Sequence, residues 1–157
     1  MDKIITLDGK EYKLVEVGKE EKNEDFETGD TLFYISIYGE VMSTIFESTA
    51  VDRKLVVFWN AFRTKKLAQK ELNTRFAIVR VKKYIADNFG VWELTDEEWE
   101  DGDIDKHYIC FDYSDKSLVI NCFWRHKSYS PIWYLENKAI CSDVIANCKE
   151  DLEIIFK

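Results

Sequence analysis

Alternating apolar and polar residues mark the segments that we expect to form β-strands. The clearest segment is 31–46, where Phe33, Ile35 and Ile37 fall on one face and Tyr38-Gly39-Glu40 supplies a turn. Similar but shorter runs predict further strands, namely a hairpin over 3–17 around Asp8-Gly9, a strand at 54–59, a hairpin of 106–113 with 117–125, and a short strand at 131–134. Antiparallel hairpins are therefore expected near both ends of the chain.

A helical repeat predicts one long helix, which we expect to be the spine of the fold. Thr64 is placed to cap its N-terminus, and Gly90 stands where a finished helix needs a positive φ. About 24 residues at 1.5 Å each give a rod of roughly 36 Å. Its buried stripe is expected to consist of Ala68, Leu72, Phe76 and Val79.

Shorter helices are expected in the second half of the chain. Thr95 and Glu98 have the spacing of a capping box, which predicts one or two helical turns. Residues 136–148 predict a further helix, and 151–156 predict a final helical turn.

The two halves of the chain share an order of elements that suggests an internal ββ(β)α duplication, over about 31–90 and 106–157. Phe62 precedes Ala68 by the same six residues that separate Trp133 from Ala139, so each helix is expected to place an alanine on its buried face. The predicted fold class is α+β, a single domain over 1–157 with antiparallel hairpins packed on one long and one shorter helix.

Composition adds a globular, non-membrane character to this picture. Of 157 residues, 46% are hydrophobic and 15% aromatic, enough to bury a core without disulfides. No apolar run approaches the length of a membrane span, and Met1-Asp2-Lys3 leads into a strand pattern and not into a signal peptide. The four cysteines include no CxxC pair, and no export signal is visible, so we expect reduced thiols in a cytosol.

Charge is distributed unevenly along the chain. The net charge is −8, yet residues 53–83 contain ten basic residues and one acidic residue, so this stretch carries +9 and the remainder carries −17. The basic candidates for a partner or nucleic-acid contact are Lys65, Lys66, Lys70, Arg75, Lys82 and Lys83. The acidic candidates are Glu93, Asp96, Glu97, Glu98, Glu100, Asp101, Asp103 and Asp105.

Each charged stretch has two interpretations. The lysines and arginines can follow a phosphate backbone, or they can form a solvated face that docks against the acidic stretch. The carboxylates can imitate the phosphates of a nucleic acid and steer the protein to a basic cleft, or they can simply keep the protein soluble.

Other chemistry is weakly indicated. His107-x-x-Cys110 and Cys122-x-x-x-His126 resemble metal-ligand spacings on paired strands. However, residues three apart on a strand point to opposite faces, so His107 and Cys110 are not expected to share an ion. The chain has no nucleophile elbow and no glycine-rich phosphate loop. We therefore expect no catalytic residues, no metal and no cofactor.

Four stretches resemble a family of small phage and prophage proteins of unassigned function: FYISIYGEV, WNAFRTKKLAQKEL, HYICFDYSDK and PIWYLENKAICSDVIANCKEDLEIIF. The similarity covers roughly residues 31–157. The family pattern enters its first helix through Gly-Asn-x-Phe-x-Thr-x-Glu-Glu-Ala, whereas this chain has Trp59 in place of the glycine and begins the helix with Lys65-Lys66 and no glutamate pair. The resemblance implies a mobile-element origin, and with it the cytoplasm of a host cell, but it supplies no mechanism and no catalytic residues.

Together, the resemblance and the charge pattern favour an accessory protein that acts by binding. The specific hypothesis is an anti-CRISPR-like inhibitor of a host defence nuclease, which contacts the effector through the acidic surface, or contacts guide RNA or DNA through the basic helix. The alternative is a protein that sequesters a nucleotide signal in a pocket of aromatic residues, namely Trp124, Tyr129, Trp133 and Tyr134. These rings are also what an ordinary core and hairpin would contain.

Overall fold

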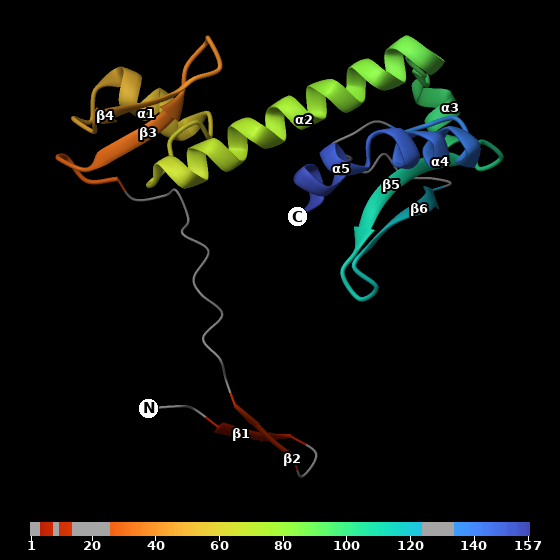
Figure 1. The fold of residues 1–157 in the computed structure, drawn as a ribbon, viewed down its shortest axis with the longest axis horizontal. Helices are drawn as coiled ribbons and strands as arrows, with labels where there is room; N and C mark the ends of the chain where they lie inside the picture. The colour runs from red at the N-terminus through yellow and green to blue at the C-terminus, as the bar shows by residue number, and fades with distance from the viewer. Residues whose placement is uncertain (1–3, 8–9, 14–25, 124–133) are drawn as a thin grey trace. The chain divides into compact units, whose positions relative to one another are not determined.

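The computed structural model describes residues 4–7, 10–13, 26–123 and 134–157, and its helices and antiparallel strand pairs form an α+β fold, as predicted (Figure 1). The described strands form three two-stranded sheets, β1–β2, β3–β4 and β5–β6. The chain divides into two compact units, 1–68 and 69–157. The elements in chain order are β1 (Ile4–Leu7), β2 (Lys10–Lys13), β3 (Thr31–Ile35), β4 (Val41–Ile45), α1 (Ala50–Val57), α2 (Lys65–Phe89), α3 (Asp96–Glu100), β5 (Lys106–Asp112), β6 (Ser117–Phe123), α4 (Lys138–Asn147) and α5 (Lys149–Phe156).

The first unit contains the two predicted N-terminal hairpins. Strands β1 and β2 pair antiparallel, with Ile4 opposite Lys13. Strands β3 and β4 pair across a turn in which Gly39 has a φ of +74°, a conformation that glycine adopts without steric cost. The core of this unit is a small apolar cluster of Leu32, Phe46 and Ala61, packed against Phe26, Tyr34, Leu55 and Val56.

The predicted strand at 54–59 is wrong, because most of this stretch belongs to helix α1. The prediction relied on the β-branched and aromatic residues of the stretch and missed the helix start that lies before it. Thr49 and Asp52 form a capping box: the Thr49 hydroxyl accepts from the Asp52 amide, and the Asp52 carboxylate accepts from the Thr49 amide. These bonds satisfy amides at the start of the helix, and they outweigh the strand preference of the residues that follow.

Helix α2 begins and ends as predicted, but its buried stripe is different. The Thr64 hydroxyl accepts from the Leu67 amide at the N-terminus, and Gly90 follows the helix with a φ of +78°. Ala68 and Leu72 are buried, whereas Phe76 and Val79 are 46% and 60% exposed. In the second half of α2 the buried side chains are Ala77, Val81 and Ile85.

The second unit packs its helices on one hairpin. Strands β5 and β6 pair antiparallel from Lys106 opposite Phe123 to Asp112 opposite Ser117. The core combines side chains from α2, β5, α4 and α5, and its buried members are Val81, Ile85, Ile109, Leu135, Cys141, Val144, Cys148 and Leu152. All four cysteines of the chain are free thiols.

The same arrangement occurs once in each unit. A residue just before a helix pairs with a strand of the preceding hairpin, as Phe62 does with Phe33 and as Leu135 does with His107. Each of the two residues lies two positions before the residue that caps the following helix. This recurrence concerns backbone pairing and not only composition, and the duplication itself stays a prediction.

The expected equivalence of Ala68 and Ala139 is wrong. Ala68 is fully buried, whereas Ala139 lies on the exposed side of α4. Counting from the two helix caps instead aligns Ala68 with the buried Cys141. A small side chain is thus buried at the same turn of both helices.

Candidate functional site

The acidic stretch 93–105 is the first candidate surface. It contains the short helix α3, which the Thr95–Glu98 capping box starts as the sequence predicts. Hydrogen bonds from the backbone and hydroxyl of Thr95 lower the pKa of Glu98. This carboxylate therefore serves to cap the helix. The exposed acidic residues of the stretch are Glu93, Asp96, Glu97, Glu100, Asp101, Asp103 and Asp105.

Several of these carboxylates are not paired with a basic residue of the described part of the chain. Within the described part of the chain, none of Glu93, Glu97 and Glu100 forms an ion pair. Asp101 is used locally, because its side chain accepts from the Asp103 amide. The acidic surface therefore contains at least three exposed carboxylates that no described basic residue neutralises.

The basic candidates on α2 are used differently. Arg75 forms an ion pair with Glu71 at 2.8 Å, and Lys83 forms one with Asp87 at 2.8 Å. In each pair the two residues lie four positions, or about one helical turn, apart. The Lys70 ammonium donates to the backbone carbonyl of Lys157 at 3.4 Å. Lys65 and Lys66 are exposed and form no ion pair with a described residue, while Lys82 is half-buried.

Arg80, which lies on the same helix, is also engaged. Its guanidinium donates from Nε to both carboxylate oxygens of Asp151 at 3.1 Å, and its Nη2 also donates to this carboxylate. This fork-like contact raises the pKa of Arg80, the largest cause being the hydrogen bonds to Asp151. The basic helix therefore offers less free positive charge than its sequence indicates.

An aromatic surface on the first unit was not predicted from the sequence. Ile37 and Tyr38 at the β3–β4 turn are 93% and 83% exposed, and Phe58 and Trp59 after α1 are 73% and 70% exposed. Two hydrogen bonds connect the segments that carry these side chains. The Asn60 side chain donates to the Ile35 carbonyl at 2.8 Å and accepts from the Ile35 amide at 3.3 Å. Trp59 has a φ of +56°, a left-handed backbone conformation that glycine adopts more readily than tryptophan.

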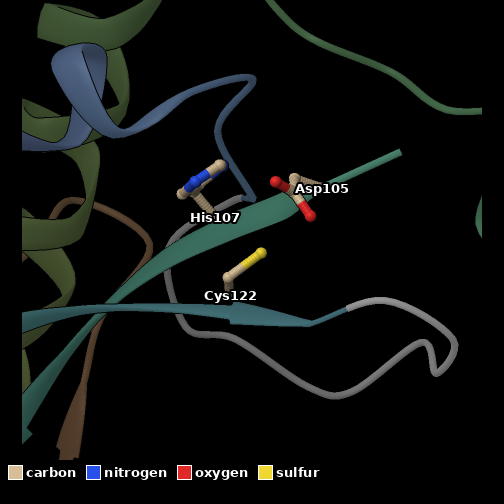
Figure 2. Close-up of side chains that lie close together, drawn as sticks. All are labelled: Asp105, His107 and Cys122. Carbon is tan, nitrogen blue, oxygen red and sulfur yellow. The ribbon is translucent and has the colours of Figure 1, made fainter. Parts of the chain in front are cut away.

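Three polar side chains meet at one end of the β5–β6 hairpin (Figure 2). They are Asp105, His107 and Cys122, and one potential ligand atom of each lies within 4.8 Å of the others. His107 and Cys122 are directly opposite in the strand pairing, and Asp105 immediately precedes β5. Because side chains two apart on a strand share a face, Asp105 and His107 extend to the side on which Cys122 lies.

Cys110 and His126, which the sequence analysis grouped with His107 and Cys122, do not complete this cluster. Cys110 is absent from it, as strand alternation predicts, and its Sγ accepts from the Asn121 side chain at 3.1 Å. His126 lies outside the described residues. The third member is Asp105, which the sequence analysis assigned only to the acidic stretch.

The electrostatics of the cluster argue against a nucleophilic cysteine. Burial and a hydrogen bond to Asp105 raise the pKa of Cys122, so the thiol holds its proton at neutral pH. Reactive cysteines have lowered pKa values. The arrangement Asp–His–Cys is thus unlike a catalytic triad, in which the histidine takes the proton from the nucleophile.

Two cavities among the described residues bear on the alternative nucleotide pocket, and neither is an aromatic-lined space of the size of a base. One between α2 and the segment before α4 encloses about 20 Å³, room for one water molecule, and Trp92 and Tyr134 line it. A larger depression of about 540 Å³ is lined by charged residues, including Arg80, Lys149 and Asp151, and by no aromatic ring. Trp124, Tyr129 and Trp133 of the proposed aromatic pocket lie outside the described residues.

Comparisons with protein-family models, with curated proteins and with solved structures found no significant match for this chain. Among the described helices, none combines the length and the apolar composition that a membrane crossing requires.

Proposed function

We propose that this protein is a non-enzymatic binding protein that docks the acidic stretch 93–105 on a basic surface of another protein. The observation that carries the proposal is the set of exposed carboxylates on and beside α3, of which Glu93, Glu97 and Glu100 have no ion pair in the described part of the chain. Such a field accelerates association with a positively charged cleft and loses strength with salt.

A protein partner fits these charges better than nucleic acid does. The net charge of the chain is −8, and ion pairs already engage Arg75, Arg80 and Lys83 on the basic helix. A surface that binds a phosphate backbone instead needs several free cations in a row. The partner class that we propose is a nucleic-acid-binding protein with a basic cleft, and a host defence nuclease is the specific case that the phage resemblance suggests.

The aromatic surface of the first unit also supports a protein partner. Exposed Trp and Tyr side chains are typical anchors of protein interfaces, because they bury a large area at a small cost in conformational entropy. Tyr38 and Trp59 supply two such rings, beside Ile37 and Phe58. This surface gives the partner a second place at which to contact the chain.

The proposal is tested by a charge-reversal variant, Glu93→Lys, Glu97→Lys and Glu100→Lys, which leaves the capping residue Glu98 intact. The control is Glu47→Lys, Asp115→Lys and Glu150→Lys, which changes the net charge equally at exposed positions outside both the acidic stretch and the β3–β4 turn. A host nuclease captured from lysate with the wild-type protein should then be purified, and its association rate measured with all three proteins.

The expected result is an association rate that falls roughly tenfold or more in the α3 variant with little change in dissociation, and that falls much less in the control. Inhibition of the nuclease should fall in the same order. Equal rates for all three proteins from about 50 to 500 mM salt would contradict a charge-steered contact.

A further inference from the structure

The cluster of Asp105, His107 and Cys122 has the composition of a metal site. Its three ligand atoms lie within 4.8 Å of one another, and the pairing of β5 with β6 fixes the two strands that carry His107 and Cys122. Zinc ligands bind at about 2.0–2.3 Å, so small side-chain rotations bring three atoms at this separation onto one ion. Figure 2 shows His107 on β5, Asp105 just before this strand and Cys122 on the neighbouring β6, with the three side chains close together.

The donor set selects the class of metal. A thiolate, an imidazole and a carboxylate are together the ligands of zinc and its neighbours, whereas magnesium and calcium require oxygen ligands. A divalent ion that displaces the Cys122 thiol proton is bound by a thiolate and a carboxylate, which supply two negative charges to it. The intervening Lys106 points away from the cluster, because its ammonium donates to the Asp101 carbonyl at 2.6 Å and lies over the Trp99 ring.

A second observation at the same place indicates a missing partner. The Nδ1 atom of His107 is buried and has no hydrogen-bond partner within the described part of the chain. Buried polar atoms are nearly always satisfied, and an ion is one of the partners that can satisfy an imidazole nitrogen. We propose that Asp105, His107 and Cys122 form a binding site for a divalent transition-metal ion of the zinc type, with the fourth position open to water or to an external group.

This site goes beyond the proposed binding function and is tested without any partner protein. The full-length chain is titrated with cobalt(II), which replaces zinc and gives a charge-transfer absorption when a thiolate binds it. The expected result is one saturable cobalt site per chain with this absorption, and its displacement by zinc. The absence of saturable binding at one ion per chain would overturn the proposal.

Three variants identify the ligands. Cys122→Ser should remove the charge-transfer absorption, and Asp105→Asn should weaken binding more than tenfold, since even outer partners of metal ligands contribute 10–100-fold. Cys110→Ser is the matched control, because this thiol lies on the same hairpin outside the cluster, and it should bind as the wild type does. Asp105 is exposed, so its variant keeps the test valid if Cys122→Ser does not fold. An unchanged absorption in Cys122→Ser would also overturn the assignment.

Discussion

The Tyr84 hydroxyl on α2 donates a hydrogen bond to the Asp143 carboxylate on α4 across 2.6 Å. The bond connects the second half of the long helix to the helix that covers the β5–β6 hairpin. Because a carboxylate accepts only while the phenol keeps its proton, this contact raises the pKa of Tyr84 to about 12, from an ordinary 10.0.

The first prediction concerns this bond. A group whose pKa is raised by folding contributes stability that is fully present below pH 10 and is lost as the pH rises to about 12. Tyr84→Phe should therefore be less stable than the wild type at neutral pH, and the difference should shrink as the pH rises from 10 to 12. Urea melts across this range measure it, and a difference that stays constant would mean that the bond is not formed.

The second prediction concerns the buried face of α2. Phe76→Ala should lower the free energy of unfolding by less than about 1 kcal/mol, because the ring is 46% exposed and alanine is the better helix former. Ile85→Ala should cost about 2–5 kcal/mol, because Ile85 is 2% exposed in the core of the second unit. Denaturant melts of the two variants compare them directly. A larger loss of unfolding free energy in Phe76→Ala would mean that Phe76 is buried, as the sequence repeat indicated.

The fold was predictable wherever local signals and tertiary contacts agree. Thr64, Gly90 and the Thr95–Glu98 pair mark helix ends through their own backbone bonds, so spacing alone located them. Burial along α2 was not predictable past Leu72, because the side chains that are buried depend on what packs against each turn. A single repeat carried from Ala68 cannot anticipate the change to Ala77, Val81 and Ile85.

The candidate sites were likewise predictable only as far as local sequence signals reach. The acidic stretch was visible because charge needs no contact to be read from a sequence. Two of the three residues of the proposed metal cluster could be suggested from the sequence, because His107 and Cys122 lie on strands that were predicted to pair. The register that places them opposite one another comes from the structure. Asp105 was assigned to the acidic stretch, and its position beside β5 assigns it to both sites.

The third prediction concerns Trp59. Its φ of +56° is a conformation that costs a residue with a Cβ roughly 1–2 kcal/mol and costs glycine nothing. Its ring is 70% exposed and contributes little burial in return. Trp59→Gly should thus be more stable than Trp59→Ala by about 1 kcal/mol, since the two variants lack the same ring and differ in the Cβ.

The same pair separates stability from function. Against the wild type, Trp59→Gly should change the free energy of unfolding by less than about 1 kcal/mol, because relief of the positive φ offsets the greater freedom of glycine in the unfolded chain. Both variants should bind the partner more weakly if the ring is an interface anchor. A partner affinity equal to that of the wild type in both variants would remove Trp59 from the interface. If affinity falls in both while stability holds in Trp59→Gly, the strained and exposed tryptophan is retained for contact and not for folding, which is the circumstance in which backbone strain persists.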